Sequence, residues 1–351
     1  MNNLTLFERL KLLRCLLIGF IIVFITSENL RAQTDSTYIQ NLSELFALKM
    51  SVNTETNGFN LTIDDIDYDV FPNTSIHNSY TFSYRFLTLT LSFDPGALNL
   101  NSDTDIRGET RTVQYSTELR FNRIVQFLEY NTTKGYYLKN SSDFDQIWRD
   151  GDPFIQYPDV SYTYLSGATL LKLNPNLSIA ALSAPNTRQL KTIGTFVPNI
   201  SYRYYILKDD NGVVQNTLSQ EARSFEAVFS LGYMQTFVFK NNTYLSLGGF
   251  PGIGFRNTNL STDFTDGSSD TSTRNTLIYR MALISGFGYD SGRFYCGARI
   301  IGNLIHQKDP EAQASLDRNE LNAEVFAGYR FNAPRFLQRG FNFIQDAIPF
   351  L

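Results

Sequence analysis

The sequence predicts an all-β fold, an antiparallel transmembrane β-barrel of 12–14 long strands with short periplasmic turns, long extracellular loops and a short C-terminal amphipathic helix. The first observation is a strict alternation of apolar and hydroxylated side chains, as in "LTLTLSF" (87–93). The second is length: most predicted strands run 10–18 residues, as a tilted bilayer crossing of about 9–11 requires, whereas sandwich strands average about 5–6. The third is that short turns alternate with long polar segments, which is typical of outer-membrane barrels.

The N-terminus has the pattern of an export signal. Arg9, Lys11 and Arg14 precede the apolar run 15–25, and Ala32 offers a small residue before a cleavage point. A transmembrane anchor is the alternative, but 11 apolar residues fall short of the roughly 20 that a helical span needs. We therefore expect a cleaved signal peptide at 1–32, an outer-membrane barrel at 33–331 and a periplasmic helical tail at 332–351.

Charge and cysteine content narrow the class of partner. Residues 1–32 hold four basic and two acidic residues, so their removal changes the net charge from −4 to −6. A mildly acidic chain without a basic tract predicts no nucleic-acid partner. Only Cys296 remains after the signal, which leaves no intrachain disulfide and no zinc-type spacing. We predict no cofactor and no metal site.

The alternating strands need an explanation for their apolar face. Polar residues occupy every second position of 87–93, and the other positions are the predicted lipid-facing set: Leu87, Leu89, Leu91 and Phe93. No stretch after residue 32 could span a membrane as a helix, and a closed barrel is the other structure that pairs every backbone group in hydrocarbon. These side chains are therefore predicted to contact outer-membrane lipid.

The predicted strands follow one another along the whole mature chain. They lie at about 44–53, 76–86, 87–94, 110–122, 123–138, 159–173, 176–186, 190–207, 222–239, 243–257, 274–289, 292–306 and 319–331, with long loops at 95–109, 139–158, 208–221, 258–273 and 307–318. Thirteen strands conflict with the even number that a single-chain barrel of this kind needs. We place the miscount within 187–221, where Pro198 and "DDNG" (209–212) interrupt the pattern.

The last predicted strand adds a link to biogenesis. Tyr329 and Phe331 lie on its lipid face, in the position where the barrel-assembly machinery of this general class reads a terminal aromatic residue. We expect that machinery as a partner during insertion, and a monomer afterwards.

Charged residues recur on the polar face of the strands. This set is Arg85, Glu118, Arg120, Glu226, Arg299, Glu324 and Arg330. A barrel of 12 to 14 strands has a lumen between the filled interior of small barrels and the channel of large ones. The set is predicted to line a narrow pore or to close it by cross-linking, and buried charges must pair in either case.

Several segments in order resemble a known family. These are "LFALKMSVN" (45–53), "DYDVFPN" (67–73), "YTFSYRFLTLTLSF" (80–93), "EYNTTKGYYLKN" (129–140), "YPDV" (157–160) and "AGYRF" (327–331). Together they are similar to domain of unknown function 4421, a family of predicted outer-membrane barrels typical of Bacteroidetes. The resemblance implies a fold and a compartment but no activity.

The sequence shows no catalytic signature. His77 and His306 stand 229 positions apart, and neither a metal-binding histidine pair nor a G-x-S-x-G motif is present. We predict that the protein is not an enzyme, and that it passes a small solute or has a structural or binding role at the cell surface. An outer-membrane enzyme of lipase type and a soluble exported β-sandwich are the alternatives.

The tail abandons the period of two. Leu337, Phe341, Ile344 and Ile348 recur at helical spacing, after Pro334 in a predicted first turn. The apolar stripe of this helix needs a cover, which is predicted to be the inner leaflet interface or the mouth of the barrel.

Overall fold

The computed structural model of the chain describes residues 35–63, 66–73, 76–93, 103–121, 123–179, 186–210, 217–308 and 314–347. The predicted signal peptide, 1–32, lies outside these residues. Within them, no helix is long and apolar enough to cross a membrane.

The described residues form long strands with few helices. The strands are β1 (Ile39–Asn41), β2 (Leu45–Ile63), β3 (Ile66–Phe71), β4 (Ile76–Tyr84), β5 (Leu87–Phe93), β6 (Arg111–Arg120), β7 (Ile124–Leu138), β8 (Ile155–Leu171), β9 (Thr187–Gln189), β10 (Ile193–Asp209), β11 (Thr217–Val238), β12 (Thr243–Phe264), β13 (Ser269–Asp290), β14 (Phe294–Lys308) and β15 (Ala314–Asn332). The α-helices are α2 (Thr104–Arg107) and α4 (Arg335–Ala347), and the 3-10 turns are η2 (Ser141–Asp143) and η3 (Lys240–Asn242).

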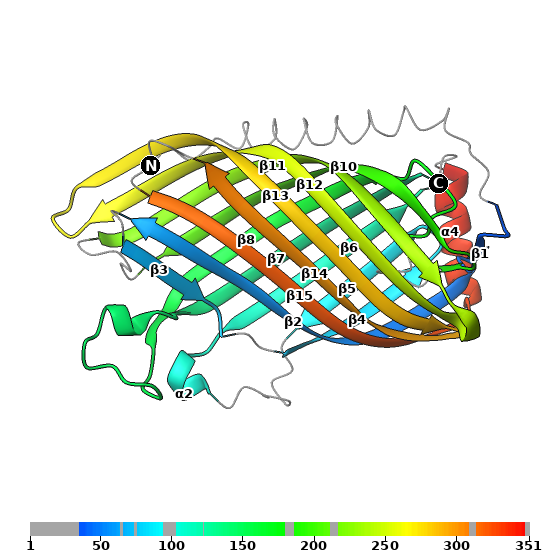
Figure 1. Cartoon of the computed structure of the whole chain (residues 1–351), viewed down its shortest axis with the longest axis horizontal. Coiled ribbons are helices and arrows are strands. Elements are labelled where there is room, and N and C mark those ends of the chain that lie inside the picture. The colour runs from blue at the N-terminus through cyan, green and yellow to red at the C-terminus, as the bar shows by residue number, and fades with distance from the viewer. Residues whose placement is uncertain are drawn as a thin grey trace.

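The sheet closes on itself as an antiparallel barrel (Figure 1). The last strand, β15, pairs with the first long strand, β2, over its full length, in a register that sets Val325 opposite Val52. Twelve strands make the closed wall. The all-β class and the predicted count of 12–14 strands are confirmed.

Both ends of the wall have a distinct character. We call the end where β2 begins and β15 finishes the helix end, because α4 lies there, and the opposite end the loop end (Figure 1). Four connections at the helix end are short: 85–86 between β4 and β5, 121–123 between β6 and β7, 239–242 between β11 and β12, and 291–293 between β13 and β14. At the loop end, 139–154 between β7 and β8 is much longer and contains η2.

The predicted strand at 176–186 is wrong. Its described residues, 176–179 and 186, lie in turns, and 180–185 lie outside the described residues. The short strand β9 follows and pairs with β1 in a separate two-stranded sheet at the helix end. Removing this strand from the predicted thirteen leaves the even number that closure with both ends on one side demands. The placement of the miscount within 187–221 was therefore wrong, because the superfluous strand is the one at 176–186.

One predicted loop, 258–273, is also wrong. β12 continues to Phe264 and β13 begins at Ser269, and their ladder runs without interruption to the pair Asp263 and Ser269. The hairpin therefore extends beyond the rest of the barrel at the loop end, where it is drawn in yellow in Figure 1. Polar side chains on the two strands bond to one another, as Thr273 Oγ1 does to Asn259 Oδ1 at 2.6 Å. The polarity of these residues predicts a loop, but they form a paired hairpin.

The wall narrows toward the loop end. The strands β4, β5 and β6 have 9, 7 and 10 residues and stop partway. Beyond them β3 pairs with β2 on one side, Val70 opposite Phe59, and with β7 on the other, Phe71 opposite Tyr137. One short strand thus replaces three, so the loop end encloses less space than the helix end.

The outer surface of the wall is apolar along its middle strands. Side chains at every second position are about half exposed, including Leu165, Phe229, Phe255, Leu283, Leu304 and Val325. The alternate positions on the same strands point inward. This is the division that alternating hydrophobicity predicts for a barrel.

Candidate functional site in the charged lumen

The lumen begins with hydroxyl groups on β4 and β5. Residues directly opposite one another bond across the two strands: Ser79 to Ser92 at 2.6 Å, Thr81 to Thr90 at 3.0 Å, and Ser83 to Thr88 at 2.6 Å. The inward face of 87–93 is therefore a ladder of satisfied hydroxyls. The leucine face of the same strand points away from the lumen.

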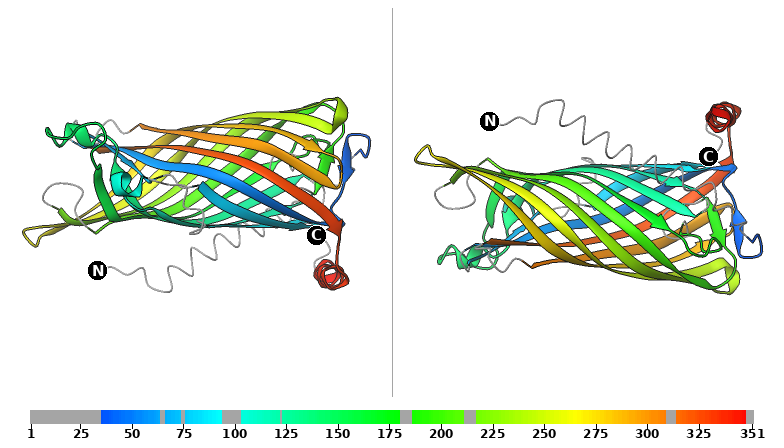
Figure 2. Two further views of the ribbon diagram at one scale, coloured as in Figure 1. Left: turned by 90° about the horizontal axis from the view of Figure 1, so that it is seen from below. Right: turned by 90° about the horizontal axis from the view of Figure 1, so that it is seen from above.

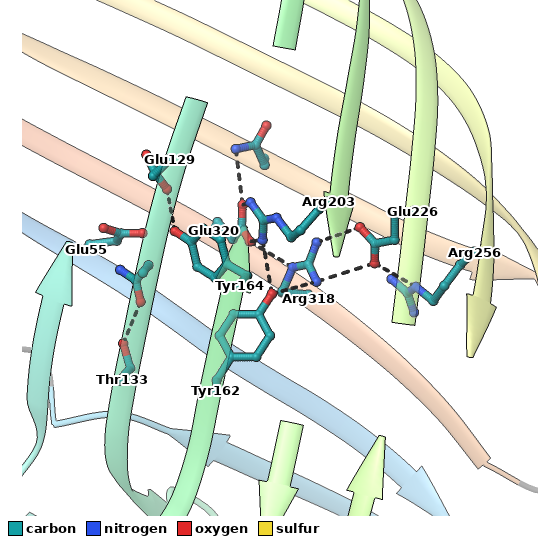
Figure 3. A network of polar contacts seen from close by, with 12 residues as sticks. Glu55, Glu129, Thr133, Tyr162, Tyr164, Arg203, Glu226, Arg256, Arg318 and Glu320 are labelled. Carbon is teal, nitrogen blue, oxygen red and sulfur yellow. Dashed lines mark hydrogen bonds and ion pairs between the residues drawn. The ribbon is translucent and has the colours of Figure 1, made fainter. Parts of the chain in front are cut away.

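A belt of ion pairs crosses the middle of the lumen (Figure 3). We call Arg203, Glu226, Arg256, Arg318 and Glu320 the central belt. Arg318 Nη2 donates to Glu226 Oε2 at 3.0 Å, and Arg318 Nε lies 2.8 Å from Glu320 Oε1. Arg256 Nε donates to the other oxygen of Glu226 at 2.7 Å. Arg203 pairs with both oxygens of Glu320, the longer contact at 3.2 Å.

The sheet register explains part of the central belt. Arg203, Glu226 and Arg256 are direct neighbours across β10, β11 and β12. Arg318 and Glu320 reach them from β15, on another part of the wall. The belt is thus a bridge through the barrel, and Arg318 is only 1% exposed.

Aromatic rings cover the belt on its loop-end side. The hydroxyl of Tyr162 accepts from Arg318 at 3.1 Å and from Arg203 at 3.2 Å. Arg203 also stacks on Tyr164, with 4.4 Å from its Cζ to the ring centroid. These rings belong to a buried cluster that fills the narrowed loop end: Phe59, Tyr68, Val70, Tyr136, Leu138, Val160, Tyr162, Tyr164 and Tyr205.

A second group of charges lies on the part of the wall that runs from β6 through β2 to β14. One carboxylate oxygen of Glu324 pairs with Lys49 Nζ and the other pairs with Arg299 Nη2, each at 2.7 Å. Arg299 and Glu324 are opposite one another in the β14–β15 register. Glu118 and Arg120, two positions apart on β6, form a pair of 2.6 Å.

The helix end is closed by one further pair and an apolar cap. Arg330 makes two bonds to Asp290, of 2.8 and 2.7 Å, and stacks on Tyr295. Leu177 and Ile179, from the connection after β8, are fully or almost fully buried. They pack against inward apolar side chains of the wall: Val125, Leu170, Val197, Met234, Phe250 and Ala282.

Small separate cavities remain between these layers. One of about 310 Å³ lies beside Glu118 and Glu324, and one of about 170 Å³ beside the central belt. A third, of about 440 Å³, opens at the helix end beside Lys172. Burial, together with the charge of Arg120, lowers the pKa of Lys172 to about 8, while Glu118 opposes the shift. Side chains that line an open aqueous pore would be accessible to water, whereas Glu226, Arg256 and Arg318 of the belt are at most 4% exposed.

The structure corrects the placement of Arg85. This residue lies in the turn between β4 and β5, with a φ of 49°, and not on the inner face of a strand. Its Nη1 donates to Asn342 and Gln345 of α4, at 2.8 and 2.6 Å. The alternation that runs through β4 stops at the turn, so Arg85 joins the tail to the rim of the barrel.

The sequence predicts a helix in the C-terminal tail, and α4 (Arg335–Ala347) is that helix. Phe341 packs between Tyr84 and Phe86. The centroid of its ring lies 4.9 Å from that of Tyr84 and 5.3 Å from that of Phe86. Figure 2 shows α4 end-on at the edge of the barrel, and no residue of α4 is buried. The helix therefore does not fill the barrel mouth.

Sequence reasoning found some of the lumen charges and missed others. Of the predicted set, Glu226 is in the central belt, and Glu118, Arg120, Arg299, Glu324 and Arg330 lie in other paired groups of the lumen. The missed members are Lys49, Arg203, Arg256, Asp290, Arg318 and Glu320. Arg318 and Glu320 could have been predicted from their positions. Alternate residues of a strand share one face, and both lie on the same face of β15 as Glu324.

The predicted lipid-facing residues all lie on the outside of the wall. Leu89, Leu91, Phe93, Tyr329 and Phe331 are 40–46% exposed, and Leu87 is partly exposed. Of the two histidines, His77 is buried on β4, and His306 points outward on β14. Among the described residues, no group of three His, Cys, Asp or Glu could hold a metal ion.

The family model of Domain of unknown function (DUF4421) matches residues 33–331. The chain belongs to this family. The match covers the whole predicted mature chain up to the end of the barrel, as the segments at 45–53 and 327–331 imply. No curated protein matches this DUF4421 chain.

Solved outer-membrane barrels resemble this DUF4421 member distantly. The outer membrane protease OmpT from Escherichia coli is 9% identical, with a TM-score of 0.40 over 83% of this chain and 98% of that chain. The Ralstonia pickettii toluene transporter TbuX is 10% identical, with a TM-score of 0.33 over 83% and 92%. A Pseudomonas aeruginosa FadL homologue is 9% identical, with a TM-score of 0.27 over 85% and 93%. Likeness at this level transfers no activity.

Proposed function

We propose that this chain is an outer-membrane β-barrel whose lumen is closed at rest, and whose role is structural or ligand-binding rather than open passage. The membrane assignment is supported by the closed ladder, which leaves no unpaired sheet edge. It is also supported by the apolar outer face, where Phe229 and Val325 are 55% and 65% exposed. A soluble sandwich would bury such a face against a second sheet.

The central belt is the observation that carries the closed state. Arg318, Glu226 and Arg256 are at most 4% exposed although they project into the middle of the lumen. Charges of this kind must be paired when they leave water, and here they pair with one another across the barrel. The aromatic cluster and the cap formed by Leu177 and Ile179 close the space on either side.

We also assign α4 to the membrane interface on the helix-end side. Its axis lies across the barrel axis in Figure 1, which is the orientation of a helix resting in the plane of a bilayer surface. Phe336 and Phe343 are 72% and 76% exposed on the side not held by Phe341. An amphipathic helix with an apolar face and basic residues, here Arg335 and Arg339, is suited to a lipid interface.

A closed lumen predicts that the protein does not conduct ions across a membrane. The purified full chain, reconstituted in planar lipid bilayers, is expected to show no conductance steps at moderate voltage. Deletion of 334–351 is expected to leave that silence unchanged, because α4 lies outside the barrel mouth. An open porin added to the same bilayer is the control for insertion and detection.

Regular conductance steps from the wild-type chain would contradict the closed state. Steps that appear only after deletion of 334–351 would show that α4 acts as a plug.

A further inference from the structure

We propose that the lumen binds a small anion of one negative charge beside Arg280 of β13. Arg280 is the one arginine near the central belt for which the described part of the structure shows no ion pair. The inference goes beyond the proposed function, because a barrel with no transport role could hold the same ion.

In the described part of the barrel, Arg280 is the arginine without a carboxylate partner among the four that surround the middle of the lumen. The others are Arg203, Arg256 and Arg318. Glu226 pairs with Arg256 and Arg318, and Glu320 pairs with Arg203 and Arg318. Glu129 lines the same cavity as Arg280 but accepts from the hydroxyl of Tyr164 at 2.5 Å, and no ion pair joins it to Arg280 among the described residues.

The arginines of the neighbouring groups do have carboxylate partners. Beside the central belt, Arg120 pairs with Glu118, and Arg299 pairs with Glu324. At the helix end, Arg330 pairs with Asp290. Arg280 of β13 differs from these arginines in lacking such a pair among the described residues.

The contacts of Arg280 do not neutralise it. Its Nη2 donates to the hydroxyl of Ser230 at 3.2 Å, and its Nε is buried with no hydrogen-bond partner among the described residues. An arginine cannot shed its proton in a protein, and a charge drawn partly out of water without a partner is costly. Arg280 is only partly exposed, so a small anion from solution would supply the partner that the protein does not.

The space beside Arg280 fits a small ion. Arg280, Arg203 and Arg318 line the cavity of about 170 Å³, and Ser166, Ser201 and Asn303 add polar groups to it. Since one water needs about 10–15 Å³ of cavity volume, the cavity has room for a small anion together with several waters. The planar guanidinium favours carboxylates and other oxyanions, which it can bond with two N–H groups, so formate-sized carboxylates and halides are the ligand class.

Thermal unfolding of the full chain in detergent tests the site. In a buffer whose only anion is bulky, added formate or bromide at constant ionic strength is expected to raise the Tm of the wild type to a plateau. Arg280→Gln should weaken the apparent affinity at least tenfold. Arg274→Gln, at an exposed position on the same strand, should respond as the wild type does. Without small anions, Arg280→Gln should be no less stable than the wild type, because it removes an uncompensated charge.

A plateau that persists in Arg280→Gln with unchanged affinity would overturn the proposal. So would a wild type whose Tm rises with neither ion. If Arg280→Gln fails to fold, crystals of the wild type soaked in bromide decide: an anomalous peak within hydrogen-bond distance of Arg280 supports the site, and no peak in that cavity overturns it. A response to formate alone identifies a carboxylate site, and a response to both ions identifies a general monoanion site.

Discussion

Replacing Arg318 by alanine is expected to lower the free energy of unfolding by about 3–5 kcal/mol, the usual cost of removing one partner from a buried ion pair. Arg318 is 1% exposed and contacts Glu226, Glu320 and Tyr162. Its loss removes one of the two arginines that pair with Glu226 in the described part of the barrel and leaves Arg256. The measurement is reversible urea unfolding of the chain in lipid vesicles, followed by tryptophan fluorescence.

The matched control for this prediction is Lys208→Ala. Lys208 pairs with Asp210 at 2.8 Å, but both side chains are nearly half exposed at the loop end. An exposed pair of this kind contributes about 0–1 kcal/mol. Equal, small effects of the two substitutions would show that the central belt does not stabilise the closed lumen.

Replacing Leu89 by arginine is expected to cost about 2–4 kcal/mol if the residue lies near the bilayer midplane, by the depth-dependent cost of a basic residue on the lipid face. Leu89 lies at the centre of β5 with its side chain 44% exposed. The same unfolding measurement in vesicles gives the number.

The neighbouring substitution, Thr90→Arg, serves as its control. Thr90 points inward and lines the cavity of about 310 Å³, which also holds Glu118. A new guanidinium there meets polar groups instead of hydrocarbon, so its cost should be smaller. If Leu89→Arg costs no more than Thr90→Arg, the outer face of β5 does not contact lipid.

Much of the fold was predictable because alternation of side chains reports directly which face of a strand is buried. The same rule produced the error at 176–186. Leu177 and Ile179 alternate with Ser178 as in a strand, but they bury their side chains in the cap at the helix end without joining the wall. Alternation therefore indicates alternate burial and does not show that a segment is paired.

The candidate site was only partly predictable for a related reason. The alternation of side chains along a strand assigns Glu226 and Glu324 to the inner face, but it does not predict which residues they contact there. The contact between Arg318 and Glu226 joins positions 92 residues apart, and its formation depends on the diameter and tilt of the closed barrel. Arg280, by contrast, is distinguished from the other lumen arginines only by the contacts of the folded barrel, because its sequence position does not reveal that it lacks an ion pair.

The most direct test of the closed barrel is thiol labelling at two neighbouring positions of β12, in a chain with Cys296→Ser. Ser246→Cys places a thiol on the inner face, where Ser246 is fully buried, and Leu247→Cys places one on the outer face, where Leu247 is 43% exposed. A thiosulfonate reagent that is charged and water-soluble reacts with the thiolate. Ser268→Cys, in the exposed turn between β12 and β13, is the positive control.

In folded protein in vesicles we expect rapid labelling of the Ser268→Cys variant only, and labelling of all three variants after denaturation. Labelling of Ser246→Cys in the folded chain would show that water fills the lumen. Labelling of Leu247→Cys would show that the apolar face meets water rather than lipid. Either result would contradict a closed barrel embedded in the membrane.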